Sequence, residues 1–152
     1  MRVSAKADYA VRAAIELAAT DGEHHVKKHE IVKNQKIPTK FLENILSELR
    51  HAGLIESQRG ADGGYWLTKP ASEITVADVM RAVEGPLASV RSTRPEDLEY
   101  EGKAEPLQKV WVALRQSIRD VLEATTLEHL AEGELPEPVT SELEIPDAWS
   151  SQ

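Results

Sequence analysis

Cysteine is absent from the 152-residue sequence. Its absence excludes disulfides, thiol redox switching and a nucleophilic cysteine, together with cysteine-ligated zinc or iron–sulfur clusters in a single polypeptide. Long apolar runs are also lacking, since none approaches the roughly 20 residues that span a bilayer. The charged start of the chain has no signal-peptide core. We therefore expect a cytoplasmic protein without membrane contact.

Recognisable catalytic motifs are missing as well. The sequence has no nucleophile elbow and no helix that carries metal ligands. Its glycine-rich segment 60–64 superficially resembles a phosphate-binding loop, but no helix follows it and the Gly-Lys-Ser/Thr end is lacking. We therefore expect the protein not to be an enzyme, and we expect no cofactor.

Basic charge is scarce overall but is concentrated in the first half of the chain. The formal net charge is −8. Residues 1–70 carry 11 Lys and Arg against 9 Asp and Glu, a net of +2, whereas residues 71–152 carry 7 against 17, a net of −10. Because local charge sets the attraction to phosphates, the acidic total does not exclude nucleic acid as a partner.

The most informative stretch covers residues 28–68. A short helical segment around Ile31 and Val32 is interrupted at 35–38, and a second amphipathic helix covers 39–50. Two short strands then flank the glycine-rich tip. This order predicts a winged helix-turn-helix, which places one helix in the DNA major groove. The predicted fold class is mainly α, with a two-stranded β wing and a long dimerisation helix.

Two further helices are expected around this motif. One covers 4–19, with Ser4 as its N-cap. The other begins at Thr75, where Asp78 completes a capping box, and stops at Gly85-Pro86; we expect it to pack beneath the wing. Together these elements predict a DNA-binding domain over 1–85, followed by a connector or sensor loop over 86–105.

A long amphipathic helix is expected within 106–130. Its apolar side chains recur at alternating spacings of four and three, which predicts a stripe that needs a partner surface. The amino-terminal domain could cover the stripe, but we favour a homodimer because closed two-fold symmetry is the commonest assembly. The predicted dimerisation residues are Leu107, Trp111, Leu114, Ile118 and Val121. Residues 131–152 hold six acids and no base and are expected to form a mobile acidic tail.

Candidate base contacts lie at the start of the second motif helix. A helix that enters the groove uses its amino-terminal side chains, here Thr39, Lys40, Glu43 and Asn44. Asn can bond adenine, Lys can donate to guanine and Glu can accept from a cytosine amine. The alternative is an ordinary solvent-exposed face.

Further candidate contacts lie on the wing and beside the motif. Arg59 can enter a narrow minor groove while Gly60 lets the tip approach the DNA backbone. The alternative is a glycine-rich turn with a chance arginine. Lys6, Lys28 and Arg50 are either phosphate contacts or solvated surface.

A cluster of histidines raises the alternative of a zinc or nickel site, formed by His24, His25 and His29. Their spacing matches no metal motif, and solvated histidines near DNA are common. We therefore predict no metal site.

A series of short marks also follows in order along the chain: Met1-Arg2-Val3-Ser4, Tyr9-Ala10-Val11, Phe41-Leu42-Glu43, Leu49-Arg50, Gly53-Leu54-Ile55, Arg59-Gly60, Gly63-Gly64-Tyr65 and Ile74-Thr75-Val76. Through them the chain resembles the Rrf2 family of bacterial transcription regulators, to about residue 130. The resemblance implies a homodimer with a long dimerisation helix that binds operators as a transcription factor. We expect a palindromic operator and a repressor, with an activator as the alternative. Its two recognition units would read half-sites about one helical turn, roughly 10 base pairs, apart.

The chain departs from the iron–sulfur members of that family, which carry three cysteines in the connector. The same region here has Ser92, Leu98 and Ala104, so a conventional cluster is excluded. The effector could be a small molecule near Leu98, Tyr100 and Trp111, it could be another protein, or there could be none. The main alternative function is a winged-helix module that binds proteins and has lost its operator.

Overall fold

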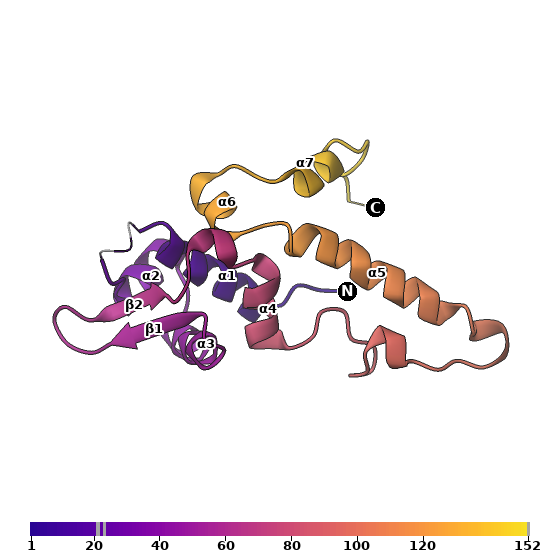
Figure 1. Cartoon of the computed structure of the whole chain (residues 1–152), viewed down its shortest axis with the longest axis horizontal. Coiled ribbons are helices and arrows are strands. Elements are labelled where there is room, and N and C mark those ends of the chain that lie inside the picture. The colour runs from indigo at the N-terminus through magenta and orange to yellow at the C-terminus, as the bar shows by residue number, and fades with distance from the viewer. Residues whose placement is uncertain (21, 23, 152) are drawn as a thin grey trace.

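The computed structural model describes residues 1–20, 22 and 24–151, which form a compact body and an arm. Helices α1 (Ala5–Ala18), α3 (Thr39–His51) and α4 (Val76–Glu84) pack together in the body, and α5 (Leu107–Leu122) forms the arm (Figure 1). The Ser4 hydroxyl caps α1 by accepting a hydrogen bond of 3.0 Å from the Ala7 N–H. Since the buried face of α1 consists mostly of alanine, its neighbours approach its backbone closely.

The helix-turn-helix consists of α2 (Lys28–Gln35) and α3, with a sharp turn between them. Lys36 ends α2 in the left-handed conformation, with φ of 53°. Strands β1 (Ile55–Gln58) and β2 (Gly64–Leu67) then form an antiparallel hairpin in which Ile55 is paired with Leu67. The predicted winged helix-turn-helix is therefore confirmed.

Helix α4 follows the short 3₁₀ turn η1 (Ala71–Glu73) and begins at the predicted capping box. The Asp78 N–H donates to the Thr75 hydroxyl at 3.1 Å, and the Thr75 N–H donates to the Asp78 carboxylate at 3.0 Å. The predicted position beneath the wing is wrong, however, because α4 packs mainly on α1 and α3. The alanine face of α1 offers the closer surface for its apolar stripe.

The helix expected over 106–130 is divided in two. After the connector, which contains η2 (Pro95–Asp97) and η3 (Gly102–Ala104), α5 ends at Leu122 and α6 (Leu127–Glu132) returns to pack on α1. Leu127 is fully buried in the core, and its N–H donates to the Ile74 carbonyl at 2.9 Å. The segment expected as a mobile acidic tail contains helix α7 (Glu137–Leu143), which contacts α5. Across the described residues, no helix is long and apolar enough to cross a membrane.

Truncation of Leu127 tests whether α6 belongs to the core. Leu127→Ala is expected to lower the free energy of unfolding by about 2–5 kcal/mol, because it leaves a cavity among buried side chains. Leu135→Ala is the matched control, since that side chain is exposed and its truncation is expected to change the free energy by less than ~0.5 kcal/mol. Urea denaturation followed by circular dichroism measures both. Equal losses in the two variants would contradict the docking of α6.

Candidate DNA-binding surface

The exposed face of α3 carries the four residues predicted to contact bases. Its opposite face is anchored by Leu42, Ile45, Leu46 and Leu49, which are at most 1% exposed. The helical period therefore turns the predicted base-contacting side chains to solvent, and all of them are exposed: Thr39, Lys40, Glu43 and Asn44. The four predicted residues thus share one accessible surface.

Glu43 is held by an ion pair with Lys28 of α2. The Lys28 ammonium donates to the Glu43 carboxylate at 2.7 Å. This hydrogen bond is the main reason why the pKa of Glu43 is lowered, and the charges of Lys28 and Lys40 add to the effect. The same bond raises the pKa of Lys28. Glu43, a predicted base contact, and Lys28, a predicted phosphate contact, are therefore joined by one ion pair.

The wing tip presents Arg59 and Gly60 to solvent. Arg59 makes no hydrogen bond or ion pair with any described residue, so its guanidinium is available to an external acceptor. The hairpin is tight below the tip, where a Cβ atom on Gly63 would lie 2.1 Å from the Gln58 carbonyl oxygen. Only glycine fits at this position.

The segment before α2 supports the wing, a role that sequence reasoning missed. The Lys27 ammonium donates to the Gly60 and Ala61 carbonyl oxygens at 2.9 and 2.8 Å. The backbones of Val26 and Tyr65 exchange hydrogen bonds of 2.9 and 2.8 Å. This segment therefore adds a single β-bridge to β2 and holds the tip through Lys27, although no sequence signal distinguished Lys27 from other surface lysines.

His25 also supports the wing. Its ring stacks on Trp66 with 4.0 Å between centroids, and its Nδ1 lies 3.0 Å from the Asp62 carbonyl oxygen. The sequence had offered His25 as one of three candidate metal ligands, with His24 and His29. Throughout the described residues, no group of three or more His, Cys, Asp or Glu side chains could hold a metal ion.

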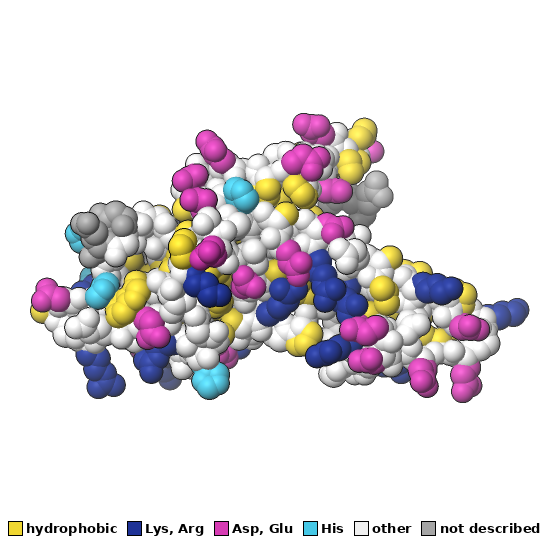
Figure 2. Space-filling view, in the orientation of Figure 1, with side chains coloured by type: hydrophobic (Ala, Val, Ile, Leu, Met, Phe, Trp, Pro, Cys, Tyr) yellow, Lys and Arg dark blue, Asp and Glu magenta, His cyan; other side chains and the backbone are white. Residues whose placement is uncertain are grey.

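The remaining predicted phosphate contacts lie beside α3. The Lys6 ammonium of α1 pairs with Glu48 at 2.8 Å, and Arg50 donates to the Ser57 hydroxyl of β1 at 3.0 Å. Figure 2 shows Lys and Arg side chains projecting below the wing and α3, whereas Asp and Glu gather over α6 and α7 on the opposite side. The basic side of the body is therefore the side of the predicted contacts.

The predicted dimerisation residues form a half-buried stripe along α5: Leu107, Trp111, Leu114, Ile118 and Val121. The connector covers part of this stripe, and the Trp111 indole donates to the Tyr100 hydroxyl at 3.0 Å. Val110 at the edge of the stripe remains 54% exposed. Part of the apolar surface of α5 thus lacks intramolecular cover.

A recognition helix, a supporting helix and a wing define a winged helix-turn-helix protein. The chain belongs to the Rrf2 family, because the model of that family, an iron-dependent transcriptional regulator, matches residues 3–133. It is therefore a transcriptional regulator, and the family implies DNA binding. The family and its named relatives are regulators and not enzymes.

Relatives and solved structures agree with this assignment. The HTH-type protein Rv1287 of Mycobacterium tuberculosis is 50% identical over 139 residues, which are 91% of this chain and 86% of that protein. The structure of CymR, the global cysteine regulator of Bacillus subtilis, is similar with a TM-score of 0.74 and 37% identity, and the match covers 88% of this chain and 98% of that one. The structure of T. potens IscR gives a TM-score of 0.70 and 33% identity, covering 88% and 89%.

The iron dependence in the family description does not fit the connector of this chain. Ser92 is exposed in a turn and Ala104 lies in η3. Leu98 is only 4% exposed and fills the space under the connector with an apolar side chain. None of these three side chains supplies the thiolate that an iron–sulfur cluster requires.

The pKa of Glu43 is expected to rise in Lys28→Gln, because the substitution removes both the hydrogen bond and the charge that stabilise the carboxylate. In the unsubstituted protein the pair persists until the pH falls through the lowered pKa of Glu43. Lys40→Gln is the matched control, because Lys40 acts through charge alone and makes the smallest contribution. Carboxyl NMR titration measures the pKa in each variant. A shift in Lys40→Gln as large as that in Lys28→Gln would refute the ion pair.

Proposed function

We propose that this regulator is a cytoplasmic repressor that binds a palindromic DNA operator as a homodimer, without an iron–sulfur cluster. The observation that carries the proposal is the joint exposure of the amino-terminal face of α3 and the wing tip on the basic side of the body (Figure 2). This arrangement suits simultaneous contact with the major groove and an adjacent minor groove.

In the proposed complex, the exposed start of α3 contacts base edges through Thr39, Lys40, Glu43 and Asn44. The Asn44 amide can bond adenine, and Lys40 can donate to guanine. Glu43 accepts from a cytosine amine once Lys28 exchanges it for a phosphate. In this exchange the Lys28 ammonium stays paired, now with a phosphate. The Glu43 carboxylate is released only where a cytosine amine can donate to it. The exchange therefore favours operator DNA over DNA of random sequence.

The wing and the neighbouring basic residues supply the remaining proposed contacts. Arg59 enters the minor groove, and Gly60 allows the backbone of the tip to approach a phosphate. Lys6, Lys28 and Arg50 contact phosphates and fix the register of the body on the duplex. Lys27 supports this arrangement indirectly, because it holds the carbonyl groups of the wing tip.

The arm presents a surface that suits a second copy of this chain, related by two-fold symmetry. Beside the half-covered stripe of α5 lies a cavity of about 580 Å³, lined by Ile118, Val121 and the start of the chain. Met1 and Val3 in that start are 90% and 71% exposed. Together these apolar side chains make a continuous surface that a second copy would cover. A small molecule or another protein could control the dimer as an effector.

Sequencing of genomic DNA retained by the purified protein at physiological salt tests the proposal. We expect a recurrent palindrome with half-sites about one helical turn apart. The logarithm of the affinity should then fall with the logarithm of salt concentration, with a slope of about 0.9 for each phosphate contact. If no specific DNA is retained, the alternative of a winged-helix module that binds proteins is favoured. The acidic total charge of the chain is consistent with that alternative.

Arg59→Ala is expected to weaken operator binding by roughly 1–3 kcal/mol without unfolding the protein, because the guanidinium is exposed and has no described intramolecular partner. Lys69→Ala is the control, since Lys69 is also exposed and basic but follows the far end of β2. Fluorescence anisotropy with labelled operator measures both affinities. Unchanged binding by Arg59→Ala would remove the wing from the mechanism.

Leu114→Asp is expected to convert the dimer into monomers, because it buries a charge within the proposed seam. Val112→Asp introduces the same charge on the exposed side of α5, away from the stripe, and is expected to remain dimeric. Sedimentation velocity gives the mass of each variant. A dimeric Leu114→Asp protein would mean that the stripe packs only within its own chain.

A further inference from the structure

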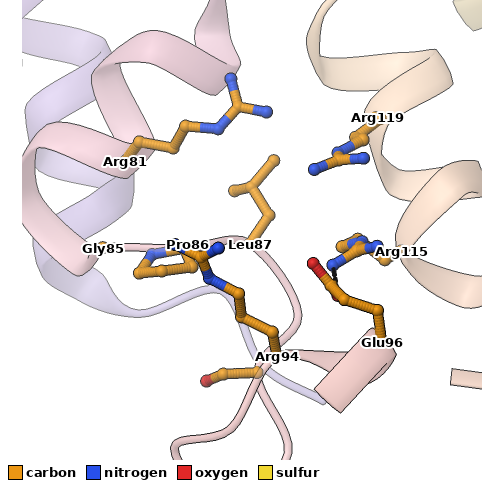
Figure 3. Close-up of a pocket in the computed structure, with 9 residues that line it drawn as sticks. Arg81, Gly85, Pro86, Leu87, Arg94, Glu96, Arg115 and Arg119 are labelled. Carbon is orange, nitrogen blue, oxygen red and sulfur yellow. Dashed lines mark hydrogen bonds and ion pairs between the residues drawn. The ribbon is translucent and has the colours of Figure 1, made fainter. Parts of the chain in front are cut away.

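Four arginines of the described chain converge on a cavity between the body and the arm (Figure 3). The cavity has a volume of about 440 Å³. Arg81 comes from α4, Arg94 from the connector, and Arg115 and Arg119 from α5. We call this cavity the arginine pocket. Its guanidinium groups approach one another from three separate segments, although like charges repel.

The carboxylates of the protein only partly compensate these charges. Arg115 forms an ion pair with Glu96, and Arg81 pairs with Glu123. Glu123 also lies 4.0 Å from the Arg119 Nε. Two carboxylates thus neutralise two of the four guanidinium charges, and a net charge of two remains positive. The Arg94 side chain makes no hydrogen bond or ion pair with any described residue.

Two N–H groups of the arginine pocket are buried without an acceptor. The Nε atoms of Arg115 and Arg119 are shielded from solvent and have no hydrogen-bond partner among the described residues. The Arg115 side chain is only 12% exposed. A buried donor without a partner is costly, and such groups in native proteins call for an explanation. The Arg119 side chain is 38% exposed, so a group bound in the cavity can approach this guanidinium from solvent.

We propose that the arginine pocket binds a small dianion of the phosphate or sulfate type, with a short apolar group attached. The planar guanidinium fork matches tetrahedral oxyanions and binds them through paired hydrogen bonds. Leu87 and Pro86 line the same cavity and offer an apolar surface to the remainder of the ligand. The volume lies within the usual range for small-molecule sites, roughly 300–1,000 Å³.

The position of the arginine pocket gives the ligand a regulatory role, which rests on the proposed function. Arg81 extends from α4, and α4 packs on the recognition helix α3. Arg115 and Arg119 extend from the proposed dimerisation helix. A bound dianion would neutralise charges on both sides and draw α4 and α5 together. The ligand therefore acts on the orientation of α3 relative to the dimer seam, and so on operator affinity.

Isothermal titration calorimetry of the full-length protein with inorganic phosphate and with sulfate tests the site directly. Phosphate or sulfate replaces chloride in buffers of the same ionic strength. Arg119→Gln is expected to weaken binding about tenfold or more, since it removes a charged hydrogen-bond donor. Arg94→Gln is a second variant that is expected to fold normally, because Arg94 is exposed. The matched controls are Arg91→Gln in the connector and Lys109→Gln on α5, whose side chains do not line the pocket. Absence of binding, or equal weakening in the controls, would overturn the site.

The regulatory role has a separate readout. Phosphate at a saturating concentration is expected to change the affinity for operator DNA by about fivefold or more. Arg119→Gln should still bind DNA but lose this response, which excludes simple competition between phosphate and DNA. Binding of phosphate with no change in DNA affinity would overturn the regulatory role. Failure to bind DNA with or without phosphate would instead overturn the proposed function, while the calorimetric result on the site would stand.

Discussion

The close packing of α1 is the interaction on which the rest of the body depends. Helices α2, α3, α4 and α6 and strand β2 all contact this one helix. Its buried face consists of Ala7, Ala10, Ala13, Ala14 and Leu17. Small side chains let several backbones approach the same axis, and close packing then fixes their relative angles. The direction of α3 is therefore set largely by its packing on α1.

The separation of charge within the chain has a structural counterpart. The acidic second half supplies α6 and α7, which lie on the side of the body opposite the wing (Figure 2). On the basic side, Lys6 is paired with Glu48 and Lys28 with Glu43. Exposed pairs of this kind contribute little stability. Their exchange with phosphate oxygens therefore costs little, which suits a protein that must bind and release a polyanion.

Local signals predicted the elements well, whereas contacts between distant segments were missed. The 3.6-residue period, the capping residues Ser4 and Thr75 and the glycine-rich tip each act within a few residues, so the helices and wing could be predicted from the sequence. The return of α6 could not, because apolar spacing continues from α5 past the break, and only the tertiary position of Leu127 shows that it belongs to the body. Lys27 was missed for the same reason, since its acceptors lie more than thirty residues away. The arginine pocket was likewise not predictable, because its residues come from three segments and their positions in the sequence follow no pattern.

Two backbone hydrogen bonds join the segment between α5 and α6 to the segment at the start of α4, and they have a mechanical consequence. Val76 donates to the Thr125 carbonyl and Leu127 donates to Ile74, while the connector leaves the opposite end of α4 at Gly85. The arm is thus tethered at both ends to a single short helix and forms a closed frame with it. A frame fastened at two points resists twisting about its long axis much more than a hanging lever does. In a dimer the distance between the two recognition helices would then depend on how closely α4 and α5 approach within each frame, which is the quantity that a ligand in the arginine pocket would change.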